Sequence, residues 1–443
     1  MKNRFVLQVF LILLFSPYVY SQTGVTAVAA TPALAANLEF EKYFISKTLR
    51  VDYFLGGDAK SEVVYFSQMK QEPFWGGPHK NLIDPFGYGS YRYVAFDSAS
   101  NIMIFSRGFN SVFQEWKGTD EARKMKRALS MTAVLPFPKN TIRFIIEKRS
   151  YETNRFEPIF ERFISPSDYF INHENIHAAK VTKIKESGDP AKMVDIAFIA
   201  EGYTQGDMDK FLEDAKKMCD YIMSVTPYSD FSDRFNFYAI ESPSDEAGIT
   251  IPGKDIYVNT NIHSSFYTFD MDRYLTTFDT KSVYDIAANV PYDAIFILVN
   301  SKRYGGGGFY NHYGQSTVDH QLSKIVAIHE FGHSFAGLAD EYYTSDVAYS
   351  DFYNLKFEPW EPNITSNVNF ETKWKKMVPA GIPIPTPRNE NFKSTVGMFE
   401  GGGYLSKGIY SPKMDCRMKS NEAPGFCPVC QDAIRKMILF YCD

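Results

Sequence analysis

The sequence has no long hydrophobic run beyond its N-terminus and no excess of one charge. No other segment reaches the roughly 20 apolar residues that a membrane-spanning helix needs, so no membrane span is expected. The 443 residues carry 47 Lys and Arg against 52 Asp and Glu, a formal charge of −5. This mild negative balance gives no reason to expect binding to nucleic acid or to an anionic membrane. No internal repeat is found, which argues against a repeat architecture.

A signal for export stands at the N-terminus. Lys2 and Arg4 precede an apolar run over Phe5–Phe15, and Val19–Ser21 offers a small-residue cleavage site. The run is about half as long as a membrane span, and no cysteine follows it that would carry a lipid anchor. We therefore predict that residues 1–21 are a signal peptide. The mature protein would be secreted, held at the cell surface or periplasmic.

The five cysteines are unevenly placed. Cys219 lies in a helical pattern and is predicted to be a buried thiol, whereas Cys416, Cys427, Cys430 and Cys442 are crowded at the C-terminal end. Four such residues can form two disulfides or one structural zinc site. Because oxidising compartments preserve disulfides, export favours disulfide bonds, with three pairings left open.

The rest of the chain divides into four segments by composition. Residues 22–37 are rich in small residues without periodicity and predict a flexible tether. Short alternating apolar runs separated by turn residues predict a β-sandwich domain over 38–164. A polar linker over 165–192 leads into an α/β pattern over 193–443, whose last part is rich in cysteine.

Strands are predicted in both domains. In the first, Leu49–Leu55 is a strand candidate, and Tyr91–Phe96 and Ile102–Phe105 are predicted to pair as a hairpin. In the second, Asp207–Ser224 has the apolar face of an amphipathic helix. Three apolar runs of the second domain are predicted strands, and the last is continuous enough to be a buried central one: Val194–Ala200, Phe235–Ile240 and Ala294–Val299.

The motif that carries chemistry is His329-Glu330-Phe331-Gly332-His333. Residues four apart lie on one face of a helix, so His329 and His333 can present two imidazoles to one metal ion. Glu330 lies beside them, where it can take a proton from an attacking water. Apolar residues flank the motif on both sides, as expected of a buried helix.

The same motif occurs a second time, as His173-Glu174-Asn175-Ile176-His177. That copy sits in the polar linker, with no carboxylate at ligand spacing and no apolar residues that would bury a helix. We therefore interpret it as a chance match that binds no metal.

A third ligand is needed, because catalytic zinc keeps three protein ligands and one open position. Gly337 lets the helix end and the chain turn back, and Asp340 follows three residues later. In the metzincin pattern the third ligand also lies three residues after the glycine, although here one extra residue precedes that glycine. We prefer Asp340 as the ligand, then Glu341. A thermolysin-like arrangement would instead use a later carboxylate: Glu358, Glu361 or Glu371.

Three further features are candidates for parts of the site. Gly305–Gly308 comes before the metal helix and predicts either an edge strand that pairs with an extended substrate or a flexible loop. A methionine could lie beneath the metal or simply pack in the core; the candidates are Met414 and Met418. A tyrosine could stabilise an oxyanion; the candidates are Tyr342, Tyr343 and Tyr404.

These residues resemble a known family. His329–Tyr343 (HEFGHSFAGLADEYY) is similar to the metal helix and its exit in the M64 peptidases, which are named for IgA-cleaving members. Val194–Gln205, Val396–Tyr404 and Met414–Cys430 resemble further segments of that family. The β-rich first domain resembles the N-terminal domain found with this catalytic unit.

The resemblance implies that His329, His333 and Asp340 hold one Zn2+ and that Glu330 is the catalytic base. The predicted fold class is α+β multidomain, with an N-terminal β-sandwich followed by a zincin-like α/β metallopeptidase domain. We predict a secreted endopeptidase that cleaves extracellular proteins or peptides; IgA itself is not implied. Two alternatives stay open. One is a binding protein with a structural or vestigial zinc site, and the other is a zinc hydrolase acting on non-peptide amides.

Overall fold

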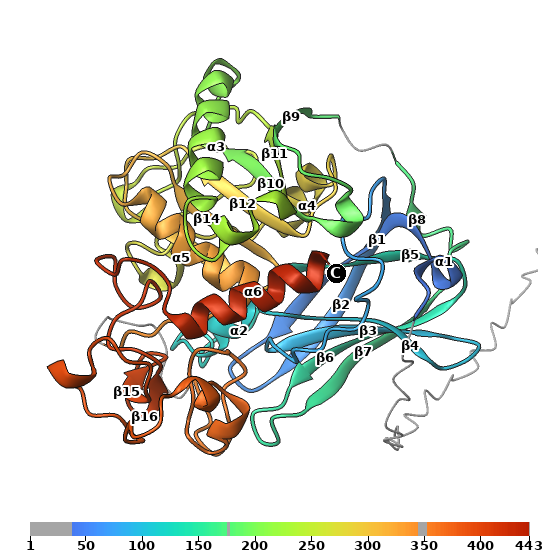
Figure 1. The fold of residues 1–443 in the computed structure, drawn as a ribbon. Helices are drawn as coiled ribbons and strands as arrows, with labels where there is room; N and C mark the ends of the chain where they lie inside the picture. Colours follow the sequence, from blue (N-terminus) through green and yellow to red (C-terminus); the bar gives the residue numbers. More distant parts are fainter. Residues whose placement is uncertain (1–37, 175–177, 344–351, 443) are drawn as a thin grey trace, which may run out of the picture. The chain divides into compact units, whose positions relative to one another are not determined.

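The computed structural model describes residues 38–174, 178–343 and 352–442, and Figure 1 shows their fold as a ribbon. The predicted signal peptide and tether, residues 1–21 and 22–37, lie outside these ranges. The architecture is mixed α/β, with a β-rich N-terminal part followed by a part in which strands and helices alternate. Within the described ranges, no helix is long and apolar enough to cross a membrane.

A four-stranded sheet begins the N-terminal part. β1 (Phe44–Gly57) lies between β2 (Glu62–Glu72) and β5 (Arg127–Pro138) and pairs antiparallel with both. The short strand β8 (Ile171–Asn172) adds to the free edge of β2. The strand predicted over Leu49–Leu55 lies inside β1 and is confirmed.

A second four-stranded sheet, antiparallel throughout, contains the predicted hairpin. Its turn is fixed by Asp97, whose Oδ2 accepts a hydrogen bond from the backbone N–H of Ser100 at 2.8 Å. Side chains from both sheets belong to one buried hydrophobic cluster, so the two sheets share a core. In order across the sheet, the strands are β4 (Met103–Phe109), β3 (Tyr91–Asp97), β6 (Ile142–Arg149) and β7 (Phe156–Ile164).

Two short helices accompany these sheets, α1 (Phe40–Tyr43) and α2 (Val112–Lys117). The second begins at Ser111, whose hydroxyl accepts a hydrogen bond from the backbone N–H of Gln114 at 3.2 Å. Trp116 anchors it in the core with no exposed surface. This fixed position of α2 is important because the helix reaches the functional site described below.

The second part is built on a six-stranded sheet with the strand order β13-β14-β12-β10-β11-β9. β10 pairs parallel with both β11 and β12, and β12 pairs parallel with β14. Every residue of β10 and β11 is buried, as expected for parallel strands covered on both faces. The three predicted strands are confirmed as β10, β11 and β12. The strands are β9 (Lys180–Lys185), β10 (Val194–Glu201), β11 (Phe235–Glu241), β12 (Ala294–Val299), β13 (Gly306–Phe309) and β14 (Tyr313–Thr317).

The predicted amphipathic helix is α3 (Met208–Ile222), whose side chains Phe211 and Met218 are buried. A capping box precedes it, in which the backbone N–H of Thr204 donates to Asp207 at 2.9 Å. The remaining helices and a small hairpin are α4 (Thr280–Ala287), α5 (Ser323–Ala336), β15 (Phe399–Gly402), β16 (Leu405–Ser411) and α6 (Pro428–Cys442). Short 3-10 turns cover Pro190–Lys192, Gln205–Asp207, Tyr228–Arg234, Pro252–Lys254, Thr268–Asp270, Phe370–Thr372, Lys375–Met377 and Glu390–Phe392.

The segment 165–192, predicted as a polar linker, adds one strand to the first four-stranded sheet and one to the six-stranded sheet. Its strand β8 pairs with β2, and its strand β9 pairs antiparallel with β11 at the edge of the six-stranded sheet. The polar composition fits this role, because edge strands expose one side to solvent.

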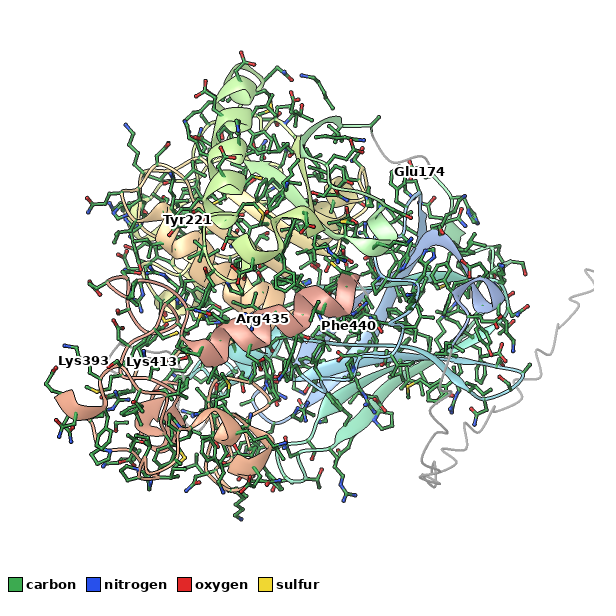
Figure 2. All side chains as sticks on the ribbon, in the orientation of Figure 1. Glu174, Tyr221, Lys393, Lys413, Arg435 and Phe440 are labelled. Atoms are coloured by element: carbon green, nitrogen blue, oxygen red, sulfur yellow. The ribbon has the colours of Figure 1, made fainter. Side chains whose placement is uncertain are left out.

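Buried polar contacts join the two parts into one compact unit. Arg50 of β1 has no exposed surface and donates to Asp52 and to Asp285 of α4, each at 2.7 Å. Phe440, labelled on α6 in Figure 2, accepts a hydrogen bond at its carbonyl oxygen from Nδ2 of Asn81 at 2.8 Å. The N-terminal part is therefore packed against the second part.

No disulfide joins the described cysteines Cys219, Cys416, Cys427 and Cys430. The Sγ atoms of Cys416 and Cys430 lie 3.7 Å apart, whereas a disulfide needs about 2.05 Å. Cys442 stands at the far end of α6 from Cys430, about 18 Å away along the helix. The preference for two disulfides is therefore wrong in this structure, because one helix holds two of the four C-terminal cysteines apart. Cys219 is buried in α3, as predicted.

Candidate metal centre

Helix α5 carries the predicted metal motif and is buried along most of its length. Its side chains Phe331 and Phe335 pack in the core of the second part. The helix ends at Gly337, which adopts a φ of 62°, a left-handed conformation that glycine tolerates. The backbone N–H of Gly337 donates to the carbonyl oxygen of His333 at 3.0 Å and closes the last turn. The chain then turns back and brings Asp340 to the side of the helix.

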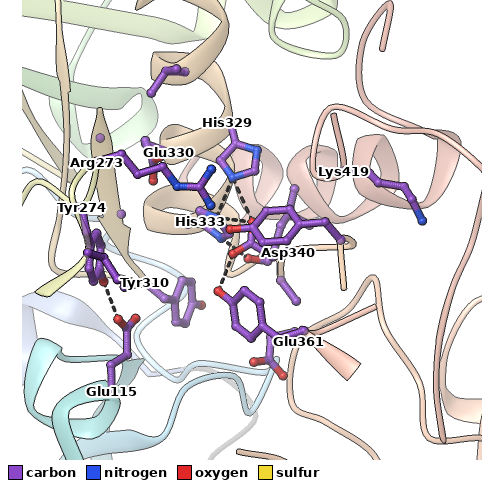
Figure 3. Close-up of a pocket in the computed structure, with 18 of the residues that line it drawn as sticks. Glu115, Arg273, Tyr274, Tyr310, His329, Glu330, His333, Asp340, Glu361 and Lys419 are labelled. Carbon is purple, nitrogen blue, oxygen red and sulfur yellow. Dashed lines mark hydrogen bonds and ion pairs between the residues drawn. The ribbon is translucent and has the colours of Figure 1, made fainter. Parts of the chain in front are cut away.

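The three predicted ligands meet at one point. Nε2 of His329 lies 3.0 Å from Nε2 of His333, and Oδ1 of Asp340 lies 3.0 and 3.3 Å from these two atoms. Figure 3 shows the two imidazoles and the carboxylate converging. Ligand atoms about 2.0–2.1 Å from one tetrahedral zinc ion would lie roughly 3.3 Å apart. The observed spacing therefore suits a single ion of that size.

Backbone carbonyls hold the outer nitrogens of both imidazoles. Nδ1 of His329 lies 3.0 Å from the carbonyl oxygen of Arg417, and Nδ1 of His333 lies 2.6 Å from that of Leu338. A carbonyl oxygen only accepts hydrogen bonds, so each Nδ1 carries a hydrogen and each Nε2 is the ring nitrogen left to face Asp340 and a metal ion. Two imidazole nitrogens and a carboxylate oxygen are ligand types typical of a catalytic zinc site. These residues therefore fit a bound metal ion.

The electrostatics of the centre favour positive charge. Burial lowers the pKa of His333, but Asp340 outweighs this effect and raises it to about 9. Burial would raise the pKa of Asp340, yet the two imidazoles hold it well below its ordinary value. A cation at the point where the ligand atoms meet is thus stabilised by the surrounding groups.

Asp340 is itself held by the β15–β16 hairpin. The hydroxyl of Tyr404 donates to its Oδ2, and the backbone N–H of Gly403 donates to its carbonyl oxygen at 2.8 Å. Tyr404 adopts a φ of 67°, which is rare for a bulky residue and is often found at functional sites. Of the other tyrosine candidates, Tyr342 lines the cavity beside the centre, and Tyr343 packs against a lysine ammonium group. Tyr404 is therefore the candidate that contacts a metal ligand.

The other proposed third ligands do not join the group of converging atoms, although Glu361 lines the same cavity. Glu341 is turned toward Cys430, whose thiol donates to its Oε1 at 3.2 Å, and Asn363 donates to the same oxygen at 3.0 Å. The structure thus brings Asp340, and not Glu341, to the two imidazoles. The later carboxylates bond to other side chains: Glu358 to Thr365 at 2.7 Å, Glu361 to Tyr353 at 3.0 Å, and Glu371 to Lys375.

Glu330 lines the same cavity, but its carboxylate is not part of the group formed by His329, His333 and Asp340. Burial raises the pKa of Glu330, and the neighbouring imidazoles of His329 and His333 partly oppose this shift. A carboxylate whose pKa lies nearer neutrality is suited to taking up and returning a proton.

Of the two methionine candidates, Met418 lies beneath the metal helix. It has no exposed surface, and its sulfur would lie 2.9 Å from a Cβ placed on Gly332. Its carbonyl oxygen accepts a hydrogen bond from the backbone N–H of Glu341 at 2.7 Å. Met414 is only half-buried.

The glycine-rich stretch forms the edge strand β13, so the alternative of a flexible loop is wrong. A Cβ on Gly306 would lie 2.7 Å from Cγ of Glu330, and one on Gly308 would clash with the carbonyl oxygen of Glu330. Glycine is needed here because the strand lies directly against the metal helix. Both glycines line the cavity. The outer edge is partly paired already, since the N–H of Leu275 donates to the carbonyl oxygen of Gly306 at 3.2 Å.

The N-terminal part also supplies residues to the cavity wall, which the sequence did not predict. Glu115 of α2 accepts a hydrogen bond from the hydroxyl of Tyr274, and Asn110 also lines the cavity. Figure 3 shows Glu115 and Tyr274 facing one another. Burial raises the pKa of Glu115 to about 7, although the hydrogen bond from Tyr274 opposes the shift. The N-terminal domain therefore contributes directly to the wall of the cavity.

The first copy of the motif is only partly described. His173 is exposed, with its Nδ1 3.4 Å from Oε1 of Gln71, and Glu174 accepts a hydrogen bond from Nδ2 of Asn172 at 3.1 Å. Residues 175–177 lie outside the described ranges, so the interpretation as a chance match stays a prediction.

Comparison with known families agrees with this geometry. The sequence model of the family described as IgA Peptidase M64 matches residues 182–392 and 388–438, and that described as Peptidase M64 N-terminus matches residues 39–161. A search of curated proteins finds no match. The peptidase match covers more than half of the chain and includes the metal helix, Asp340 and the cysteines Cys416, Cys427 and Cys430. The chain therefore belongs to the M64 peptidase family and carries that family's N-terminal domain ahead of its peptidase domain.

Proposed function

We propose that this metallopeptidase is an exported zinc endopeptidase that cleaves extracellular proteins. The family gives the peptidase activity, while the identity of the metal, the base and the compartment are proposals. The observation that carries the metal and the base is the meeting of His329, His333 and Asp340 within 3.3 Å, in the cavity that Glu330 lines. Three protein ligands leave one position of a tetrahedral ion open, as in catalytic zinc sites.

Zinc suits these ligands, because imidazole nitrogens and a carboxylate oxygen are typical of catalytic zinc. When bound, the metal would act as a Lewis acid that polarises the scissile carbonyl and lowers the pKa of water. His329, His333 and Asp340 would hold it, and the carbonyl groups behind the imidazoles would fix the orientation of the rings. The metal helix beside the edge strand of a mixed sheet is the arrangement that we propose to be zincin-like.

The residues around the metal would carry the proton transfers and the substrate. Glu330 would accept a proton from the attacking water and later pass it to the leaving amine. Gly306 and Gly308 would let an extended substrate backbone approach the metal helix closely, since neither presents a side chain. Glu115, from the N-terminal domain, would border the same substrate cleft.

The test is the substitution Glu330→Gln, assayed on a fluorescently labelled unfolded protein and by metal analysis. We expect the bound zinc to remain and hydrolysis to fall by at least about 100-fold, because the general base is lost. Glu174→Gln, in the other copy of the motif, is the matched control and should change neither measurement. Full activity of Glu330→Gln would overturn the assignment of Glu330 as the base. A zinc-loaded wild type that cleaves no unfolded protein would overturn the proposed endopeptidase activity.

Export has its own test. If residues 1–21 are a signal peptide, the mature chain begins at Gln22. Mass spectrometry of the N-terminal peptide from cell envelope and medium should find that terminus. A mature chain that keeps Met1, confined to the cytoplasm, would contradict the proposal.

A further inference from the structure

A second group of metal-ligating side chains lies outside the catalytic centre. Cys416 follows the hairpin strand β16, Cys427 immediately precedes α6, and Cys430 lies in its first turn. Glu341 joins them from the exit of the metal helix. All four side chains are buried, and their ligand atoms lie within 4.8 Å of one another.

The distances match a tetrahedral site. The Sγ atoms of Cys416 and Cys430 lie 3.7 Å apart, and Sγ of Cys430 lies 3.2 Å from Oε1 of Glu341. Two sulfurs bound to one zinc ion at about 2.3 Å and at the tetrahedral angle would lie roughly 3.8 Å apart. The backbone N–H of Cys427 also donates to Sγ of Cys416 at 3.2 Å, a contact that stabilises a thiolate.

One atom of the cluster has no partner. Oε2 of Glu341 is buried and accepts no hydrogen bond from the described residues. A buried carboxylate oxygen left in this state is costly, and such atoms are rare in folded proteins. A cation among the three sulfurs would pair with the carboxylate.

A disulfide does not account for the cluster. The observed sulfur separation is well beyond a bond, and any pair formed among three cysteines would leave the third thiol next to Glu341. Cys442 cannot complete a second pair, because α6 holds it about 18 Å from Cys430. The thiol of Cys442 donates instead to the carbonyl oxygen of Arg234 at 3.8 Å.

We propose that Cys416, Cys427, Cys430 and Glu341 bind a second zinc ion with a structural role. Four protein ligands close the coordination sphere and leave no position for water or substrate. Three thiolates favour zinc over calcium or magnesium, which prefer oxygen ligands. The buried ammonium group of Lys419 interacts electrostatically with Glu341 and Cys416 and offsets part of the negative charge of the site.

The second ion would stabilise the catalytic centre through short connections. Cys416 is followed by Arg417, whose carbonyl oxygen orients His329, and by Met418, which packs against the metal helix. Glu341 directly follows Asp340 in the chain. Fixing the cysteine loop therefore fixes both the outer contact of one catalytic ligand and the backbone of another.

The test is the zinc content of the full chain, purified without chelator, measured by elemental mass spectrometry. We expect two zinc ions per chain in wild type, one in Cys430→Ser and one in His333→Ala, with none in the double variant. Cys219→Ser is the matched control, because this buried cysteine lies on α3 away from the cluster, and it should keep two. The result does not depend on peptidase activity.

Cobalt substitution of wild type gives a second measurement in case Cys430→Ser fails to fold. A cobalt ion bound to thiolates produces charge-transfer absorption in the near ultraviolet, which should appear in wild type and persist in His333→Ala. One zinc per wild-type chain, a cobalt protein without that absorption, or a Cys416–Cys430 disulfide in a non-reduced peptide map would each overturn the proposal.

Discussion

Nδ1 of His329 donates a hydrogen bond to the carbonyl oxygen of Arg417 at 3.0 Å. Arg417 is the neighbour of Cys416, as Asp340 is the neighbour of Glu341. In each of these two adjacent pairs, one residue contacts or belongs to the catalytic centre (Arg417 or Asp340) and the other belongs to the cysteine cluster (Cys416 or Glu341). Because outer contacts of this kind orient metal-binding imidazoles, a shift of the cysteine loop would be transmitted to the catalytic ligand His329.

Tyr404 should strengthen metal binding through its hydrogen bond to Asp340. Tyr404→Phe removes the hydroxyl that orients the carboxylate, and such a loss weakens metal affinity about 10–100-fold. We expect the chelator concentration that halves peptidase activity to fall by a similar factor. Activity is the readout because hydrolysis needs the metal ion that Asp340 is proposed to hold.

Tyr410→Phe, on the neighbouring strand β16, is the control for this variant and should inactivate at the wild-type chelator concentration. If Tyr404→Phe and wild type lost activity at the same chelator concentration, the hydroxyl of Tyr404 would not strengthen metal binding through Asp340.

The helix of the metal motif and the approach of Asp340 to its imidazoles could be predicted because their signals are local. His329 and His333 are one helical turn apart, and the Gly337 that ends the helix is followed closely by Asp340. The buried strands were equally plain, since β12 is a continuous apolar run. The choice among Asp340, Glu341 and the later carboxylates needed the fold, because the turn after the helix decides which carboxylate faces the imidazoles.

Gly308→Ala should disturb the centre without touching a ligand. The new methyl group would clash with the carbonyl oxygen of Glu330 and lie 3.1 Å from Cβ of His333. Such overpacking costs about 1–3 kcal/mol, and displacing the metal helix from its strand should lower kcat/KM at least about 10-fold. The measurements are a Tm scan and a peptidase assay.

Gly206→Ala serves as the control for the glycine strand. A Cβ there would meet only the hydroxyl of Thr204, at 3.8 Å, so stability should change by no more than about 0.5 kcal/mol. A Gly308→Ala enzyme as active as this control would show that the strand and helix tolerate separation.

Arg50 should be the residue on which the junction of the two domains depends most. Its guanidinium is fully buried and bonds to Asp52, Glu72 and Asp285. Arg50→Met leaves the buried Asp52 and Glu72 without their cation, although Asp285 keeps its ion pair with Lys70, and breaking a buried pair costs about 3–5 kcal/mol. A marked fall in Tm is expected.

Arg123→Met is the exposed counterpart. Its partner Asp120 has 79% of its side-chain surface exposed, and such pairs contribute about 0–1 kcal/mol. Similar Tm values for the two arginine variants would contradict a special role for the buried network.

The parts of the site that could not be predicted come from long-range contacts. Glu115 lies in a short helix of the N-terminal domain, and nothing in its local sequence marks it as a neighbour of Tyr274. The cysteine cluster was misread for the same reason. Its fourth member, Glu341, comes from the metal helix exit, and spacing among Cys416, Cys427 and Cys430 says nothing about that carboxylate.

The raised pKa of Glu115 should make the stability of the protein depend on pH. Its pKa is about 7 in the folded chain, chiefly because of burial, and about 4.3 when unfolded. The folded state therefore binds the extra proton between these values. The stability that this proton contributes is present at low pH and is lost as pH rises from about 4.3 to about 7, by at most about 4 kcal/mol. Glu115→Gln mimics the protonated form, so its Tm should fall less than that of wild type between pH 5 and pH 8.

Glu152→Gln, at an exposed position, is the control and should follow wild type. Parallel Tm profiles for wild type and Glu115→Gln would show that this carboxyl group titrates alike in the folded and unfolded chains.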